Sequence, residues 1–164
     1  MKIDRPGAAR VLTETQVAAL VADERSKGRR IVFTSGIFDL LHPGHVRYLE
    51  AARALGDLLI VGLNADESVR RHKGQGRPVT RQDDRAEVLA ALASVDGVVV
   101  FQEDTPVDII RRIQPDILVK GADLPGDQIV GRDTVEARGG RVVVVPVEPG
   151  YSTTSMVERI RNAR

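Results

Sequence analysis

The chain passes from an apolar run, Ile31 to Phe33, into an amphipathic helical pattern through the segment Thr34-Ser35-Gly36-Ile37-Phe38-Asp39-Leu40-Leu41-His42-Pro43-Gly44-His45. This segment holds two of the three histidines of the chain, and Gly44 between them allows a close backbone approach to a ligand. A helix that begins near Pro43 directs its free N–H groups to the same place, and such a terminus attracts phosphate. The segment therefore predicts a strand, a turn that binds a polyphosphate, and a helix.

Outward from this segment, short apolar runs alternate with longer helical patterns. We expect buried strands at residues 31–34, 58–63, 98–101, 117–119 and 142–145. Helices should begin near Thr13, Pro43, Thr80, Thr105 and Ser152, the first of them with a capping box. The alternation predicts an α/β fold, a doubly wound five-stranded parallel sheet with right-handed crossovers.

Length and composition are those of one ordinary domain. We expect residues 13–164 to form it and residues 1–12 to be mobile. Lys and Arg (24) balance Asp and Glu (23), and Trp is absent, so we expect no nucleic-acid partner. Cysteine is absent, which excludes disulfides and thiolate metal sites and is compatible with a cytoplasmic location. The sequence shows no signal peptide and no apolar run of the ~18 residues that span a membrane, so we expect no membrane partner.

Polar and glycine-bearing segments follow the predicted strands. They are residues 35–45, 64–78, 120–123 and 147–154. Ligands of parallel sheets bind beyond the carboxyl ends of the strands, so these segments should converge on one site. Two simpler interpretations remain open: residues 70–77 are a solvated basic loop, and Lys120 to Asp123 is a salt-bridged strand end.

Six motifs in this order resemble the bacterial D-glycero-β-D-manno-heptose 1-phosphate adenylyltransferases, which belong to the cytidylyltransferase-type nucleotidyltransferases. The motifs are the Gly36-to-His45 segment with its HxGH sequence, Val61-Gly62-Leu63-Asn64-Ala65-Asp66, Lys73-Gly74-Gln75-Gly76-Arg77-Pro78, Asp84-Arg85-Ala86-Glu87-Val88-Leu89, Val119-Lys120-Gly121-Ala122-Asp123 and Gly150-Tyr151-Ser152-Thr153-Thr154. The resemblance covers roughly residues 28–162 and implies a Rossmann-like fold. This domain is fused to a heptose kinase in many bacteria, and 164 residues leave no room for one, so we expect the stand-alone form.

The implied reaction is adenylyl transfer, in which a heptose 1-phosphate and ATP give ADP-heptose and pyrophosphate for lipopolysaccharide or other surface polysaccharide. The sugar phosphate is itself the nucleophile, so catalysis depends on positioning and on neutralising charge. His42, His45 and Lys73 are the candidate catalytic groups. By the same resemblance, Mg²⁺ accompanies ATP, held mainly by phosphates and water, and the protein is a homodimer.

The remaining candidate residues fall into two sets. We expect the nucleotide to contact Gly36, Ile37, Phe38, Gly44, Lys120, Gly121, Asp123, Ser152, Thr153 and Thr154. We expect the sugar phosphate to lie near Asn64, Arg77 and Asp39, although Asp39 is suited to orienting its own loop. Arg85 could simply pair with Asp84 or Glu87.

Three alternatives stay open from the residues alone. His42, His45 and Asp39 could bind a transition metal, but His72, the only other histidine, adjoins Lys73 on a basic segment, and our interpretation includes no dedicated metal site. A cytidylyltransferase for a small alcohol phosphate such as glycerol 3-phosphate would carry arginine where this chain has Val147, and many relatives also carry one at the place of Val157. A non-catalytic nucleotide sensor would tolerate the loss of the two histidines and Lys73.

Overall fold

The computed structural model describes residues 10–122 and 129–163, and in them six parallel strands form one sheet in the order β1-β4-β3-β2-β5-β6. The strands are β1 Val11–Leu12, β2 Ile31–Gly36, β3 Leu58–Asn64, β4 Gly97–Phe101, β5 Ile117–Gly121 and β6 Arg141–Val145. The predicted α/β fold with a parallel sheet is confirmed. The expected number of strands, five, was wrong by one, because β1 is too short to produce an apolar pattern in the sequence.

Strand β1 lies inside the segment that we expected to be mobile. Val11 and Leu12 pair with Val98 and Val99 of β4 and add an edge strand to the sheet. These two residues therefore belong to the sheet, residues 1–9 lie outside the described part of the chain, and the mobility of residues 1–12 stays a prediction. A strand of two residues depends on its neighbour for pairing, and two residues carry no periodicity that a sequence can reveal.

Seven helices belong to the described residues. They are α1 Glu14–Ser26, α2 Pro43–Arg53, α3 Asp66–Lys73, α4 Gln82–Ala90, α5 Val107–Ile113, α6 Arg132–Glu136 and α7 Thr153–Asn162. The capping box at Thr13 forms as predicted, with Gln16 as its second member. None of these helices is long and apolar enough to cross a membrane.

Helix α3 corrects our interpretation of residues 70–77 as a loop, because residues 70–73 form its last turn. Four basic side chains in that turn lie near the negative end of the helix dipole. Arg71 also donates to the Asp104 carboxylate at 2.5 Å and to the Gln102 carbonyl at 2.8 Å. These contacts hold a polar helix whose sequence contains too few apolar residues to reveal it.

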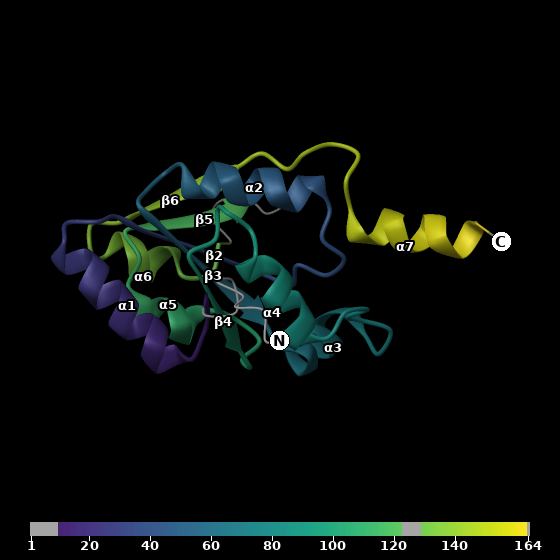
Figure 1. Cartoon of the computed structure of the whole chain (residues 1–164), viewed down its shortest axis with the longest axis horizontal. Coiled ribbons are helices and arrows are strands. Elements are labelled where there is room, and N and C mark those ends of the chain that lie inside the picture. Colours follow the sequence, from purple (N-terminus) through teal and green to yellow (C-terminus); the bar gives the residue numbers. More distant parts are fainter. Residues whose placement is uncertain (1–9, 123–128, 164) are drawn as a thin grey trace, which may run out of the picture.

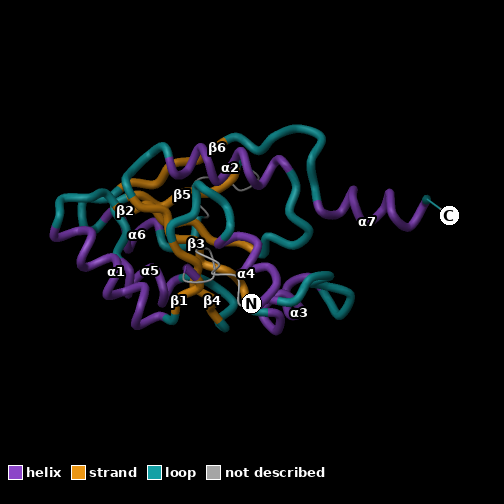
Figure 2. Tube along the Cα trace, in the orientation of Figure 1, coloured by secondary structure: helices purple, strands orange, loops and turns teal. Residues whose placement is uncertain are grey.

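The helices cover the two faces of the sheet in separate layers (Figures 1 and 2). Helices α1, α5 and α6 pack on one face, where Phe33 and Ile60 point, and α2 and α4 pack on the other, where Val32 and Leu59 point. Every residue of β3 is buried, as expected for a parallel strand covered on both sides. Helix α7 belongs to neither layer and projects from the body of the molecule (Figure 1).

The order of the strands defines one switch point. The chain adds β3 and then β4 on one side of β2, and then returns to place β5 and β6 on the other side. β2 and β5 pair through Val32–Ile117, Phe33–Leu118 and Thr34–Val119. In doubly wound sheets the crevice at the carboxyl ends of two such strands binds the ligand.

Candidate active site

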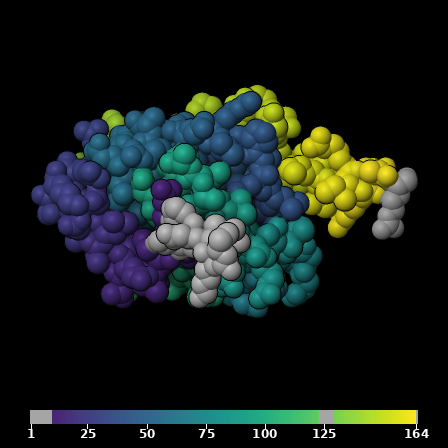
Figure 3. All heavy atoms as spheres, viewed as in Figure 1, coloured from purple at the N-terminus to yellow at the C-terminus, as the bar shows by residue number. Residues whose placement is uncertain are grey.

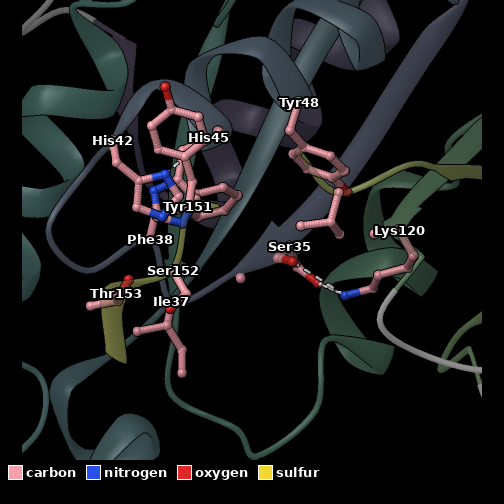
Figure 4. Close-up of a pocket in the computed structure, with 14 residues that line it drawn as sticks. Ser35, Ile37, Phe38, His42, His45, Tyr48, Lys120, Tyr151, Ser152 and Thr153 are labelled. Carbon is pink, nitrogen blue, oxygen red and sulfur yellow. Dashed lines mark hydrogen bonds between the residues drawn. The ribbon is translucent and has the colours of Figure 1, made fainter. Parts of the chain in front are cut away.

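A pocket of about 300 Å³ opens at the carboxyl ends of β2 and β5 (Figure 4). Most of the predicted site residues line it: Gly36, Ile37, Phe38, His42, Gly44, His45, Lys120, Gly121, Ser152 and Thr153. They come from three distant stretches of the chain, which the topology brings to one edge of the sheet. The predicted convergence is therefore present, while the chemical role of each residue stays a prediction.

His42 is the N-cap of α2, and the backbone of this helix determines which nitrogen of the His42 ring carries the proton. Nδ1 of His42 accepts a hydrogen bond from the backbone N–H of His45 at 3.4 Å. Burial lowers the pKa of His42, so the ring is neutral at pH 7. Because Nδ1 accepts, the proton of the neutral ring lies on Nε2, which is left as a hydrogen-bond donor.

The ring of His45 stacks on that of His42, with the ring centres 3.8 Å apart and the planes 15° from parallel. Burial and, to a smaller extent, the neighbouring His42 lower its pKa to about 4, while Asp39 opposes the shift. Among the described residues, Nδ1 of His45 is the one buried side-chain nitrogen or oxygen atom that has no hydrogen-bond partner. An unpaired buried polar atom costs stability, so this neutral ring is kept at an energetic cost.

Two further residues confine the imidazoles. Tyr151 stacks on His42 with ring centres 5.8 Å apart, and Phe38 meets His45 edge-on at 5.5 Å. A Cβ at Gly44 would lie 3.0 Å from both the His42 ring and the Cβ of Tyr151. A side chain here would press on the stacked rings, which gives Gly44 a packing role beyond the one we expected from the sequence.

Lys120 brings a cation to the switch point. Its Nζ donates to Ser35 Oγ at 2.7 Å and to the Ser35 carbonyl at 3.2 Å, across the β2–β5 boundary (Figure 4). Tyr48, which also lines the pocket, shares a 2.8 Å hydrogen bond with Thr34. The ammonium of Lys120 therefore has a fixed place on the opposite side of the pocket from the histidines.

Asp39 connects loops beside the pocket and does not line it. Its buried carboxylate accepts from Arg77 Nε at 3.0 Å and from the backbone N–H groups of Val79 and Thr80 at 2.8 and 3.0 Å. Burial opposes its ionisation, but these two N–H groups and Arg77 hold its pKa below the usual value. The Asp39 carbonyl also accepts from Thr153 Oγ1 at 2.8 Å, which attaches α7 to this loop.

The contacts of Asp39 disfavour the metal alternative. Its carboxylate is already used by three donors, and within residues 10–122 and 129–163 no three His, Cys, Asp or Glu side chains come together in a way that could hold a metal ion. A cation that acts in this pocket would be held chiefly by its ligand's oxygens and by water.

Several expected residues lie outside the lining of the pocket. Asn64 donates to Ser68 Oγ at 3.1 Å, inside the fold. Arg77 is held by Asp39, Lys73 is exposed at the end of α3, and Thr154 is exposed in the first turn of α7. Asp123 lies outside the described residues. Contacts of these side chains with a substrate stay predictions.

The sequence analysis missed Tyr48, Val147 and Tyr151, all of which line the pocket. Tyr48 could have been found, because it follows His45 by three residues and so shares its helix face. Val147 and Tyr151 lie in the segment 147–154 that we expected to reach the site, and Tyr151 belongs to one of the six motifs, but neither was among the candidate residues.

Arg85 has a different role from the one we expected. Its buried side chain donates to the carbonyls of Ile37, Asn64 and Thr80, at 2.6, 3.0 and 2.9 Å. It also pairs with Asp66 at 2.7 Å and not with its helix neighbours Asp84 or Glu87. One guanidinium thus connects the loop after β2, the end of β3 and the segment before α4.

Comparison with known proteins gives consistent similarities. Residues 33–159 match the cytidylyltransferase-like family. The chain is 51% identical over 157 residues to the bifunctional protein HldE of Geobacter sulfurreducens and 57% identical over 157 residues to that of Acidiphilium cryptum. These matches cover 96% and 95% of this chain but only 32% of each relative, so the chain spans about a third of their length.

A similar arrangement exists in a solved structure. The crystal structure of the lipopolysaccharide core biosynthesis protein from Thermoplasma volcanium matches with a TM-score of 0.61 at 29% sequence identity. The match covers 74% of this chain and 98% of that one.

Proposed function

Because the chain belongs to the cytidylyltransferase-like family of nucleotidyltransferases, we propose that its pocket transfers the adenylyl group of ATP to D-glycero-β-D-manno-heptose 1-phosphate. The products are ADP-heptose and pyrophosphate, and the pathway served is the supply of heptose to lipopolysaccharide or another surface polysaccharide. The six motifs support this choice, as do relatives about half identical over nearly the whole chain. The observation that carries the proposal is the pair of stacked neutral imidazoles at the switch point.

The reaction needs no nucleophile from the protein. An oxygen of the sugar phosphate attacks the α-phosphorus of ATP, a new P–O bond forms, and the bond to the departing pyrophosphate breaks. Negative charge then builds on the oxygens around the α-phosphorus. His42 Nε2–H and the imidazole of His45 are suited to donate to these oxygens, and one such donor is typically worth ~10²–10³ in rate.

The neutral state of both rings suits this task. Two imidazolium rings stacked 3.8 Å apart would repel each other, so in the free protein the site lacks fixed positive charge at this place. A neutral donor interacts weakly with the ground state and more strongly as charge develops. Such an interaction accelerates the chemical step rather than only tightening binding.

Two helix N-termini and one lysine complete the phosphate environment. α2 and α7, of 11 and 10 residues, both begin at the pocket, with His42 and Ser152 as their caps. Lys120 supplies a fixed cation. Val147 lines the pocket as an apolar side chain. Glycerol-phosphate cytidylyltransferases carry an arginine at this place, so the valine favours adenylyl transfer over cytidylyl transfer.

The remaining assignments belong to the same proposal. Mg²⁺ bound together with ATP would reduce the charge of its phosphates. Lys73, Arg77 and Asn64 contact the sugar phosphate or the outer phosphates, and Thr154 contributes to the α7 terminus. The protein works in the cytoplasm, as a homodimer and without a nucleic-acid partner.

Pyrophosphate release across a matrix of substrates tests the proposal. ATP and CTP are each supplied with Mg²⁺ and with heptose 1-phosphate (both anomers), glycerol 3-phosphate or ethanolamine phosphate. We expect turnover chiefly for ATP with the β-anomer of heptose 1-phosphate. Preference for CTP with glycerol 3-phosphate would replace the proposal by the cytidylyltransferase, and nucleotide binding without turnover on any acceptor would replace it by the sensor.

A further inference from the structure

Helix α7 carries an apolar strip that the other described residues cover only in part. Met156, Val157 and Ile160 are spaced so that they share one face of the helix. None of the ten residues of α7 is buried, and Ile160 is 66% exposed. In Figures 1 and 3 the helix stands out from the body of the molecule. Met156 and Val157 are partly exposed and Ile160 is largely exposed, so the strip can accept a further apolar contact.

A groove of matching character lies between α2 and α4. Its volume is about 500 Å³, and its apolar lining consists of Leu41, Pro43, Val46, Val88 and Leu92. Val88 lies on the outer face of α4 and is 48% exposed. An apolar helix face commonly binds in a groove of this kind between two helices.

The charges beside the two surfaces are opposite. Arg159 and Arg161 lie on either side of the α7 strip by their helical positions. The acidic Glu50 lines the groove, and the exposed Asp84 precedes Val88 by one turn on α4. The one basic residue of the groove, Arg47, is already paired with Glu148 at 2.7 Å. This arrangement favours a basic, apolar helix as the occupant.

The start of α7 is fixed in a way that directs it away from the groove of its own chain. Ser152 Oγ accepts from the backbone N–H of Ser155 at 3.0 Å, and Thr153 donates to the Asp39 carbonyl at 2.8 Å. In Figure 1 the helix extends away from the body of the molecule that contains α2 and α4, so its apolar strip does not occupy the groove of its own chain. We propose that α7 of each chain instead binds the α2–α4 groove of a second copy, reciprocally across a two-fold axis.

This exchange links assembly to the pocket. Ser152 and Thr153 begin α7 and also line the pocket, so a partner that holds the far end of the helix also orders its N-terminus there. The site of each chain would then be complete only in the dimer. The interface itself does not depend on which substrate the pocket binds, so it can be tested without any assay of activity.

Disulfide trapping tests the exchange directly, because the chain has no cysteine of its own. Ile160→Cys and Val88→Cys are made in separate chains of different tag length, mixed and oxidised. We expect a covalent product that contains one chain of each kind. As a control, Glu158→Cys, on the opposite face of α7, mixed with Val88→Cys should give little product.

The mass in solution supplies the second measurement. The wild-type chain should sediment at twice its mass of 17.9 kDa. Ile160→Asp should raise the dimer dissociation constant about 30-fold or more, the effect of losing an interface residue that contributes strongly to binding. Circular dichroism should show an unchanged fold, since Ile160 is largely exposed in the single chain.

Three results would overturn the inference. The first is a wild-type monomer at all concentrations. The second is a dimer whose dissociation constant Ile160→Asp leaves unchanged. The third is a disulfide that forms only within one chain carrying both cysteines, because α7 would then bind the groove of its own chain.

Discussion

His45 makes the stability of the protein depend on pH. Its pKa is about 4 in the folded chain, chiefly because of burial, against 6.5 for a free imidazole. Between these two values the unfolded chain binds a proton that the folded chain does not. Stability must therefore fall as the pH is lowered from about 6.5 towards 4 and change no further from this source below that. The lowered pKa of His42 acts in the same direction.

We expect the melting temperature of the wild-type chain to fall between pH 7 and pH 4.5, and that of His45→Gln to fall less. Asp39 does not disturb the comparison, because its pKa lies below its usual 3.8 and its contribution is lost only at lower pH. Thermal melts of both proteins at matched ionic strength measure the difference. Parallel curves over this range would show that His45 is not buried as a neutral ring.

Lys73 provides a test of the residues that lie outside the pocket. It is exposed at the end of α3, so Lys73→Ala should leave the melting temperature within about 1–2 °C of the wild type. If its ammonium approaches a substrate phosphate, the variant should raise KM for at least one substrate and also lower kcat, since the charge attracts the ground state and stabilises the transition state still more. Unchanged kinetics would remove Lys73 from the site.

How far the sequence reveals individual residues depends on whether their function follows from local spacing. His42, Gly44 and His45 were found because a strand, a glycine and a helix start stand together in one segment. Tyr151 acts through a stacked ring far along the chain, and two of the three carbonyls that Arg85 bonds, those of Ile37 and Asn64, are also distant in sequence. Local patterns do not contain such contacts.

Helix α4 supports the site through Arg85, which is 2% exposed. Removing its guanidinium leaves three carbonyls without their donor and the Asp66 carboxylate without its partner. Arg85→Ala should therefore lower the free energy of unfolding by about 3–5 kcal/mol, as for other broken buried pairs. Arg85→Lys should recover little, because one ammonium cannot bond in several directions as the planar guanidinium does.

Arg111→Ala is the matched control for Arg85. It removes an exposed arginine whose pair, with Asp108, lies on the surface of α5 at 3.3 Å. Arg111→Ala should lower the free energy of unfolding by less than about 0.5 kcal/mol. Urea unfolding of the three variants gives the comparison. An Arg85→Ala cost as small as that of Arg111→Ala would contradict the role of Arg85 as a clamp.

Among the elements, β3 and α1 were predicted from regular sequence patterns, whereas β1, α3 and α6 were not. β3 is recognisable in the sequence by its continuous apolar run, and α1 is recognisable by its capping box. β1 is two residues long, and α3 is a polar helix held by its dipole and by contacts with the segment after β4. Tertiary context determined both of these elements, and sequence periodicity could not reveal it.

In the molecule as a whole, the order of the strands determines where the site lies. The switch between β2 and β5 brings residues 35–45, 120–121 and 151–153 to one pocket. The alternation of elements predicted this edge, because parallel crossovers leave few alternatives. The direction of α7 could not be predicted in this way, since it depends on the Thr153–Asp39 contact and on what covers its apolar strip.

The central claim is that two neutral imidazoles stabilise charge on the phosphate that is being transferred, and His45→Ala tests it most directly. With ATP and heptose 1-phosphate, kcat should fall ~10²-fold or more. The dissociation constant for ATP, measured separately, should stay within a few-fold, because the donor acts mainly as charge develops. The melting temperature near pH 7 should stay close to that of the wild type. Normal turnover, or a loss of activity explained by unfolding, would contradict the account and make His45 a structural residue.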